Sequence, residues 1–371
     1  KSSIEKEIKS IFAFDRMTLS KVKMLFCCER RRKMKKIAVI FGGCSTEYEV
    51  SLQSAYAVLT HLDREKYEII SIGITREGKW FRYYGKEKYI SEDTWQEKEC
   101  NPAWILPDRV EQGILECTKE GNRLVKVDAV FPVLHGKNGE DGTIQGLIEL
   151  AGLPVIGCGT LSSSLCMDKD KAHRLVEKEG IAVPKAVVLR KGEKAGALVY
   201  PVFVKPVRAG SSFGITKVDR EEELEKAVEL AFAHDDEVII EENIEGFEVG
   251  CAVLGNDKLI VGRVDEIELS DGFFDFKEKY TLQNSKIHMP ARIDGEIEEK
   301  IKETAKKIYR TLSCKGFARV DMFLTPDKRI VFNEVNTIPG FTSHSRYPNM
   351  MKGIDMLFED VLDNLISLEV K

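Results

Sequence analysis

The stretch RIVFNEVNTIPGFTSHSR, residues 329–346, begins as a buried strand and ends in polar side chains. The apolar run IVF starts the strand, and Glu334 and Asn336 then share one face because successive strand side chains alternate. Just upstream, GFARVDMFL is a second strand pattern that places Arg319 and Asp321 on one face by the same period of two. Two neighbouring strands that each carry polar side chains on one face predict a functional site at this place in the fold.

The two strands are joined by TPDK, which is a turn signal. Folding about this turn brings Asp321 opposite Glu334, or one diagonal step from it, with Asn336 close by. Carboxylate and amide oxygens without Cys or His suit Mg²⁺ rather than Zn²⁺, and Mg²⁺ usually accompanies nucleotide phosphates. The alternative is a half-buried hairpin whose acids pair with Arg319 or Arg346.

The composition is that of an ordinary globular protein. The chain has 371 residues, 43% hydrophobic and 32% charged, with a net charge of -5. This length allows two or three domains, and the acidic balance argues against nucleic acid as a partner. No apolar run approaches the roughly 18 residues that span a membrane, so no membrane association is expected. Nine Cys without any C-x-x-C pair predict reduced thiols and a cytoplasmic location.

Residues 1–33 differ from the rest of the chain. The segment KVKMLFCCERRRKM is basic and lacks the apolar centre of a signal peptide. We interpret residues 1–33 as a disordered leader, either a tail or translated sequence upstream of Met34, because a strong strand pattern begins only after that residue. A basic surface anchor is the alternative.

Residues 34–160 are predicted to form one α/β domain. KKIAVIFGG is a buried strand that ends in two glycines, and STEYEVSLQSAYAVLTHL follows with helical spacing. This strand, turn and helix unit is typical of a doubly wound sheet, to which YEIISIGIT and DAVFPVLHG add two strands. The dinucleotide fingerprint G-x-G-x-x-G is absent from this region, so an NAD site is not expected.

Two mixed α+β units follow. The unit at 161–242 has a helix that stops at Gly180, strands around a glycine-rich loop, and the strand EVIIEENI. The unit at 243–371 has the strands FEVGCAVLG and KLIVGRVDEIEL, the helix EIEEKIKETAKKIYRTL and the polar hairpin. A polar loop at 270–290 that carries aromatic residues and Gly272 is expected to act as a lid. An ordinary surface loop is the alternative.

The glycine-rich loop KPVRAGSSFG can hold phosphate, although it is not a Walker A motif. Gly210, Ser211 and Ser212 can turn backbone N–H groups and hydroxyls toward an anion, and Lys205 adds a positive charge. The alternative is a flexible hairpin tip, but a Lys inside VFVKPV is unlike a tip residue. Farther on, Glu241 and Glu248 are candidates to bind adenine and ribose in a crevice between domains, although alone they would be a charged strand end.

The order of lysine loop, acidic segment and polar hairpin resembles that of the ATP-grasp ligases, and within them the D-alanine-D-alanine ligase family. The resemblance covers nearly the whole chain from Met34. It rests on the collinear stretches FGGCSTEYEVSLQS, LHGKNGEDGTIQGLIELAGLPVIGCG, MDKDKAH, VKPVRAGSSFGI, EKYTL, GFARVDMF and NEVNTIPGFTSHSRYP. Within the family, the chain most resembles the vancomycin-resistance branch that makes D-alanyl-D-serine. The resemblance implies a three-domain ATP-grasp fold with a Rossmann-like N-terminal domain, and a homodimer.

The resemblance also implies a nucleotide and metal site. The cofactors are ATP and Mg²⁺, with two ions that Mn²⁺ can replace. The magnesium ligands are Asp321, Glu334 and Asn336. The residues that match the ATP pocket are Lys169, Phe203, Lys205, Ser212, Glu241, Ile244, Glu248 and Lys279. One departure is His173, which stands where many members of the family have a lysine near the phosphates.

The substrate residues follow from the same resemblance. Glu47 matches the residue that receives the first substrate's ammonium, with Ser211 and Tyr280 as its hydrogen-bonded companions. Arg319 and the backbone of Gly340 match the oxyanion stabilisers. The remaining matches are Ser345, which binds the second substrate's carboxylate, Arg346 beside it at the pocket wall, and His135 at the substrate site, where a purely structural histidine is the alternative.

These matches predict an enzyme that joins D-alanine to D-serine and hydrolyses ATP to ADP and phosphate. Arg346 next to Ser345 favours D-serine, because a polar wall can hydrogen-bond a hydroxyl. Tyr280 argues against D-lactate, because family members that use D-lactate carry a histidine at that place. The first alternative is a housekeeping D-alanine-D-alanine ligase, and the second is a catalytically silent nucleotide-binding protein.

Overall fold

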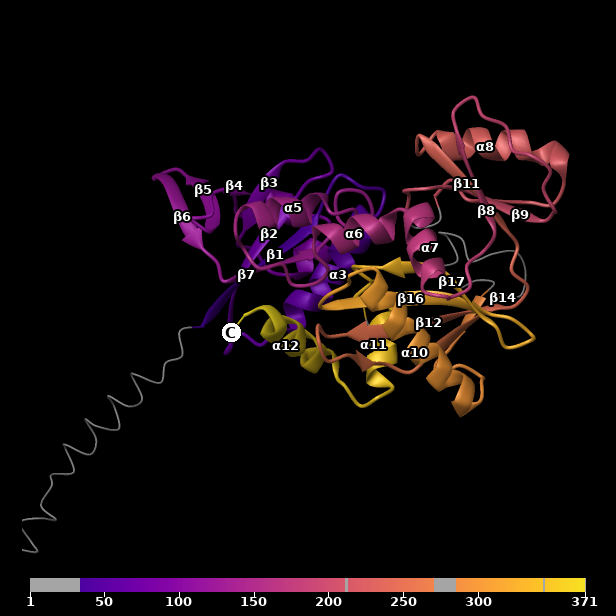
Figure 1. The fold of residues 1–371 in the computed structure, drawn as a ribbon. Coiled ribbons are helices and arrows are strands. Elements are labelled where there is room, and N and C mark those ends of the chain that lie inside the picture. The colour runs from indigo at the N-terminus through magenta and orange to yellow at the C-terminus, as the bar shows by residue number, and fades with distance from the viewer. Residues whose placement is uncertain (1–33, 211–212, 270–284, 343, 371) are drawn as a thin grey trace, which may run out of the picture.

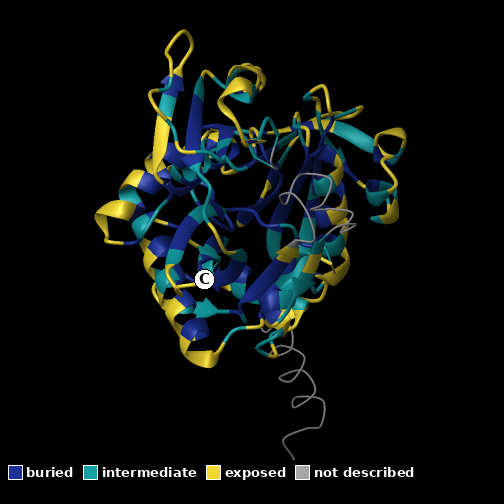
Figure 2. Cartoon of the chain, turned by 90° about the vertical axis from the view of Figure 1, so that its right-hand side faces the viewer, coloured by how far each residue is buried: buried dark blue, intermediate teal, exposed yellow. Residues whose placement is uncertain are grey.

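The computed structural model describes residues 34–210, 213–269, 285–342 and 344–370. The described chain forms three β-sheets with helices packed around them (Figure 1). Buried residues follow the strands and the inner sides of the helices, and exposed residues lie on the outer helix faces and loops (Figure 2). The predicted leader lies outside the described residues, as does most of the predicted lid.

The first sheet begins with the predicted parallel strands. β1 (Lys35–Gly42) pairs in parallel with both β2 (Tyr67–Ile74) and β7 (Ala129–Val133). An antiparallel meander extends this sheet, and it was not predicted from the sequence. Its strands are β3 (Trp80–Tyr83), β4 (Cys100–Ile105), β5 (Gly113–Thr118) and β6 (Gly121–Lys126). The helices of this region are α3 (Tyr48–His61), α4 (Lys88–Ser91), α5 (Thr143–Leu150) and α6 (Thr160–Met167).

The second sheet has four antiparallel strands in the order β10-β9-β11-β8. The strands are β8 (Ala186–Arg190), β9 (Val202–Pro206), β10 (Thr216–Val218) and β11 (Glu237–Glu242). Helix α8 (Leu224–Phe232) packs its apolar face against this sheet. Helix α7 (Lys169–Lys178) leads into the sheet and is N-capped by Asp168, whose side chain accepts from the Lys171 N–H. The helix ends just before Gly180, as predicted.

The third sheet has the order β15-β14-β12-β16-β17, with β13 paired to β12. Its strands are β12 (Phe247–Leu254), β13 (Ile260–Val261), β14 (Asp265–Leu269), β15 (Ser285–His288), β16 (Phe317–Leu324) and β17 (Ile330–Asn336), and its helices are α10 (Gly295–Thr311), α11 (Arg346–Lys352) and α12 (Phe358–Glu369). The run KLIVGRVDEIEL is two strands and not one. The break falls at Gly262, where an added Cβ would lie 2.8 Å from the Met350 carbonyl oxygen.

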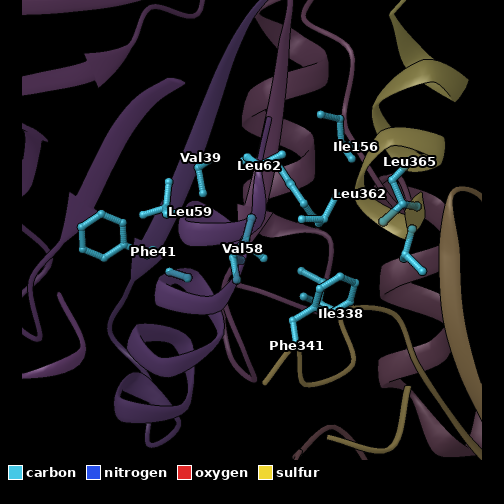
Figure 3. Close-up of a cluster of buried hydrophobic side chains, with 14 of the residues drawn as sticks. Val39, Phe41, Val58, Leu59, Leu62, Ile156, Ile338, Phe341, Leu362 and Leu365 are labelled. Carbon is cyan, nitrogen blue, oxygen red and sulfur yellow. The ribbon is translucent and has the colours of Figure 1, made fainter. Parts of the chain in front are cut away.

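One hydrophobic cluster joins the first sheet to the C-terminal part of the chain. Leu362 and Leu365 of α12 and Phe341 of the loop after β17 pack with Val58 of α3 and Val39 of β1 (Figure 3). Burial of side chains of this size stabilises the association by roughly 1.5 to 3 kcal/mol each. The loop after β17 is therefore fixed beside the N-terminal sheet.

The structure also bears on the predictions about membrane-spanning helices and about the cysteines. None of the helices in the described part is long and apolar enough to cross a bilayer. Seven cysteines in this part are free thiols, and Cys166 and Cys314 come within 3.7 Å of each other without being bonded. The distance is well above the roughly 2 Å of a disulfide.

Candidate active site

The hairpin of β16 and β17 has the predicted register. Asp321 lies directly opposite Glu334, and Arg319 lies opposite Asn336. The register shifts immediately after Asp321, so that Met322 pairs with Phe332 and the ladder contains a bulge. The two carboxylates and the amide therefore meet at the end of the hairpin where the bulge changes its course.

Asp321 lies at the centre of a cationic cluster and is 1% exposed. It accepts hydrogen bonds from Arg319 Nη2 at 2.7 Å and from Asn336 Nδ2 at 2.9 Å. Arg346 Nη1 lies 3.3 Å from its other oxygen. The alternative in which a hairpin acid pairs with arginines is thus realised for Asp321, and the oxygen donors expected for Mg²⁺ are present at the same place.

Arg346 is buried, with an exposed fraction of 8%, and three carboxylates surround its guanidinium. Its Nε and Nη2 donate to the two oxygens of Asp265, both at 2.8 Å, and Nη1 donates to Glu248 at 2.8 Å. Burial alone would lower the pKa of Arg346, but Asp265 and Asp321 raise it well above its ordinary value. From the sequence we expected a donor directed at a substrate, whereas the structure places most of its donors on protein carboxylates.

Nine of the fifteen predicted site residues in the described part of the chain line one cavity of about 1000 Å³. This cavity lies between the start of α3, the start of α7, the glycine-rich loop and the end of β17. The predicted residues in its lining are Glu47, His135, Lys169, Arg319, Glu334, Asn336, Gly340, Ser345 and Arg346. Four predicted residues, Lys205, Glu241, Glu248 and Asp321, are not part of this lining. Lys205 contacts Glu241, and Glu248 and Asp321 each contact an arginine.

The N-terminal wall of the cavity contains Glu47 and His135. Glu47 precedes α3 and is buried. His135 follows β7, and its Nε2 lies 3.0 Å from the Ser54 hydroxyl. Burial and the charge of Arg319 lower the pKa of His135 to about 4, so the ring is neutral at pH 7. His135 is therefore suited to hydrogen bonding rather than to charge pairing at the substrate site.

Glu140 is a site residue that the sequence reading did not single out. Its carboxylate accepts from the Gly136 N–H at 2.9 Å and from the Ile338 N–H at 3.1 Å. It thus connects the loop after β7 with the loop after β17. Burial and the neighbouring Glu47 carboxylate raise the pKa of Glu140 to about 8. The acid in NGEDG, a glycine-rich loop that directly follows a strand, was the signal available in the sequence.

Replacing Glu140 with Gln is expected to raise the KM for the substrate that binds in this cavity and to lower kcat/KM about tenfold. With a pKa of about 8 the Glu140 carboxyl is largely protonated at pH 7, but both of its oxygens can still accept a hydrogen bond. The NH₂ group of glutamine cannot, so a donor would face one of the two backbone donors, at a cost of about 1 to 3 kcal/mol. Steady-state kinetics and urea unfolding measure the two effects. Glu120→Gln, at an exposed position, is the matched control. Unchanged kinetics in Glu140→Gln would contradict a role in joining the two loops.

Among the residues predicted to bind the nucleotide, Phe203, Lys205 and Glu241 lie on the second sheet, and Lys169 begins α7. Lys205 of β9 donates to Glu241 of β11 at 2.6 Å, and the Lys205 ammonium lies 5.8 Å from the centre of the Phe203 ring. Burial alone would raise the pKa of Glu241, but Lys205 and His173 lower it below its ordinary value. At the start of α7, Lys169 donates to the Ala209 carbonyl at 2.7 Å, at the base of the glycine-rich loop. Ile244 follows β11 in the same region.

The end of the cavity after β17 is formed by Gly340 and Ser345. An added Cβ on Gly340 would lie 2.8 Å from the Ser345 hydroxyl, so only glycine allows this close approach. The Ser345 hydroxyl accepts from the Thr342 N–H at 3.0 Å and lies 2.8 Å from the Thr342 hydroxyl. Four predicted site residues lie outside the described part of the chain. They are Ser211, Ser212, Lys279 and Tyr280.

Family models match the two ends of this architecture. The model described as D-ala D-ala ligase N-terminus matches residues 36–158, and that described as D-ala D-ala ligase C-terminus matches residues 175–367. This chain belongs to the D-alanine-D-alanine ligase family. It is therefore a ligase of the D-alanyl-D-X type, which supplies cell-wall precursors, and its fold is the three-domain ATP-grasp fold expected from the sequence.

Similar members of the family carry different names. Vancomycin B-type resistance protein VanB of Enterococcus faecalis is 48% identical, with 91% of this chain and 98% of that protein covered. A D-alanine-D-alanine ligase of Caldicellulosiruptor bescii is 44% identical, covering 91% of this chain and 95% of that protein. The crystal structure of the VanG D-Ala:D-Ser ligase from Enterococcus faecalis matches with a TM-score of 0.84 and 61% identity, over 91% of this chain and 99% of that one. The ligase family is thus clear, and these names alone leave the second substrate open.

Proposed function

We propose that this ligase joins D-alanine to D-serine through a D-alanyl phosphate, with conversion of ATP to ADP and phosphate, and so serves vancomycin resistance. The observation that carries the proposal is one cavity lined by Glu47, Arg319 and the polar end of the β16 and β17 hairpin. The similarity to a D-Ala:D-Ser ligase at 61% identity supports the choice of second substrate. A homodimer with two such cavities is part of the proposal by family resemblance.

The first half-reaction activates a carboxylate, which is a poor electrophile at neutral pH. Glu47 is a buried acid at the cavity wall, suited to receive the ammonium of D-alanine. Lys205 and Lys169 bring positive charge to the side where ATP would lie. Asp321, Glu334 and Asn336 offer only oxygen donors from one hairpin end, which fits Mg²⁺, with Mn²⁺ as a substitute. Bound Mg²⁺ ions would neutralise the charge of the β- and γ-phosphates.

In the second half-reaction the amine of D-serine attacks the carbonyl carbon of the D-alanyl phosphate, and phosphate then leaves as the peptide bond forms. Negative charge develops on the carbonyl oxygen during this attack. Arg319, whose side chain is 12% exposed, and Gly340 both line the cavity, so a guanidinium and a backbone N–H are proposed to stabilise this oxyanion. Donors fixed before the reaction stabilise such an oxyanion more than water does. Ser345, at the same end of the cavity, is assigned to the carboxylate of the second substrate. The complete set of these groups argues against a catalytically silent protein.

The preference for D-serine over D-alanine at the second site is expected to be about ten- to a hundredfold in kcat/KM. Arg346, Thr342 and Ser345 make this end of the cavity polar. Because Arg346 already pairs with carboxylates of the protein, the hydroxyls of Thr342 and Ser345 are the groups that can hydrogen-bond the serine hydroxyl. D-alanine cannot make this hydrogen bond, a difference of about 1 to 3 kcal/mol. Product analysis with D-alanine, D-serine and D-lactate in competition measures the preference. If D-alanyl-D-alanine predominates in an equimolar mixture, the enzyme is a housekeeping ligase instead.

A further inference from the structure

Two buried polar atoms face each other at the edge of the proposed nucleotide pocket. His173 Nδ1 lies 3.8 Å from Glu241 Oε1, and the side chains are 6% and 2% exposed. Neither atom has a hydrogen-bond partner among the described residues. An unsatisfied buried polar atom costs free energy, so two of them side by side need an explanation.

The other contact of the imidazole fixes where its first proton lies. His173 Nε2 lies 2.9 Å from the Asn333 carbonyl oxygen on β17. A carbonyl can only accept, so Nε2 must carry a hydrogen and donate it. In the neutral ring, Nδ1 then presents a lone pair to the Glu241 carboxylate. The gap of 3.8 Å is too short for a bridging water, because two such hydrogen bonds through one water span roughly 4.5 Å.

We propose that His173 carries a second proton at Nδ1 and that this cation is a positioning residue for Glu241. The Nδ1–H would donate to Glu241 Oε1 after a small approach, while Lys205 holds Oε2 at 2.6 Å. The carboxylate is then fixed from both sides, by β9 and by α7. The inference rests on the proposed role of Glu241 in binding the nucleotide.

The charges around the imidazole are defined by three elements of the described chain. Glu241 on β11 favours the cation, and Lys205 on β9 is already neutralised by the same carboxylate. Lys169, one turn earlier on α7, opposes the cation but donates to the Ala209 carbonyl. From β17 the ring receives a carbonyl oxygen and the edge of an aromatic ring, with His173 and Phe332 centres 5.4 Å apart. Glu334, the acid of that strand, lines the cavity.

This arrangement has a consequence for the nucleotide pocket. Histidine is the side chain whose charge changes within the physiological pH range. A lysine at residue 173 would keep its charge throughout that range. The cation at His173 links α7, which begins with Lys169, to the strand that carries Glu241. Loss of its second proton at alkaline pH should therefore release Glu241 and weaken nucleotide binding.

Nitrogen-15 NMR of the imidazole tests the protonation state directly, with His173→Gln to identify the signals. At pH 7 the ring nitrogens of His173 are expected to show the shifts of two proton-bearing nitrogens. In Glu241→Gln, Nδ1 is expected to change to the shift of an unprotonated nitrogen at the same pH. An unprotonated Nδ1 in the unaltered enzyme at pH 7 overturns the proposal.

Nucleotide affinity tests the functional consequence. His173→Gln is expected to raise the KM for ATP and the Kd for ADP about five- to tenfold, with little change in kcat. His173→Lys is expected to restore both values and to remove the part of their pH dependence that comes from the imidazole. Thermal unfolding of each variant controls for the fold. Equal affinities and pH profiles in all three proteins overturn the positioning role.

The two tests separate this inference from the proposed function of the pocket. If Glu241→Gln binds ADP as tightly as the unaltered enzyme, the assignment of Glu241 to the nucleotide is wrong, whatever the NMR result. If Glu241→Gln loses ADP binding while Nδ1 of the unaltered enzyme is unprotonated, the pocket assignment stands and the histidine cation is overturned.

Discussion

Replacing Glu334 with Gln together with Asn336 with Ala is expected to lower kcat at least about a hundredfold, because one preorganised electrostatic group commonly contributes that much. Both side chains lie at the end of β17, line the cavity, and face Asp321 and Arg319 across the hairpin. Their loss removes the oxygen donors assigned to Mg²⁺ and leaves the apolar face of the strand intact. Turnover of D-alanine and D-serine is measured as phosphate release.

The choice of these two residues separates catalysis from folding. Asp321 is unsuitable for this purpose, because its loss would leave Arg319 and Arg346 buried beside each other. Asn336→Ala removes one hydrogen bond of 2.9 Å to Asp321, which costs only about 1 kcal/mol of stability. Glu303→Gln on α10, an exposed partner of Lys306, is the control for loss of a carboxylate. Retention of more than about a tenth of the activity in the double variant would refute the metal assignment.

The hairpin shows what local sequence determines. Period-two patterns define β16 and β17, but the register that starts at the TPDK turn would continue to place Asp321 opposite Asn333. The bulge after Asp321 moves it opposite Glu334, which is one of the two arrangements expected from the sequence. The meander of β3 to β6 was missed because its strands have four to six residues and partly exposed faces. Strands this short depend on their neighbours for stability and carry little periodicity of their own.

The partners of the site residues, in contrast, could not be predicted from local sequence. Family motifs identified most of its residues, but their partners lie far away in the sequence. Arg346 pairs with Asp265, and Glu140 accepts from Ile338, at separations of 81 and 198 residues. Burial at these positions is a property of the packed domains and not of either segment. Arg346 is the centre of an ion-pair cluster as well as part of the cavity wall. Its pairing with the distant Asp265 could therefore not be predicted from the local sequence pattern.

Replacing Arg346 with Met is expected to lower the free energy of unfolding by about 3 to 5 kcal/mol at pH 7, because it leaves buried carboxylates without their cation. Asp265 would lose both of its guanidinium hydrogen bonds, and Glu248 and Asp321 would each lose a contact. Activity should fall as well, because Asp321 is a proposed magnesium ligand. Urea unfolding at pH 7 measures the stability, and phosphate release measures the activity.

A control variant and a compensating variant test whether the loss of stability in Arg346→Met comes from buried carboxylates that lack their cation. Arg220→Met breaks an exposed pair with Glu223, whose side chains are 74% and 41% accessible, and should cost no more than about 1 kcal/mol. Adding Asp265→Asn to Arg346→Met removes the carboxylate charge that would be left without its main partner. The Asn oxygen can still accept from the Gly250 N–H, which donates to Asp265 at 3.0 Å in the unaltered protein. The double variant should therefore be more stable than Arg346→Met alone. If the double variant is instead less stable, or if Arg346→Met costs no more than Arg220→Met, the buried charges are not what Arg346 holds in place.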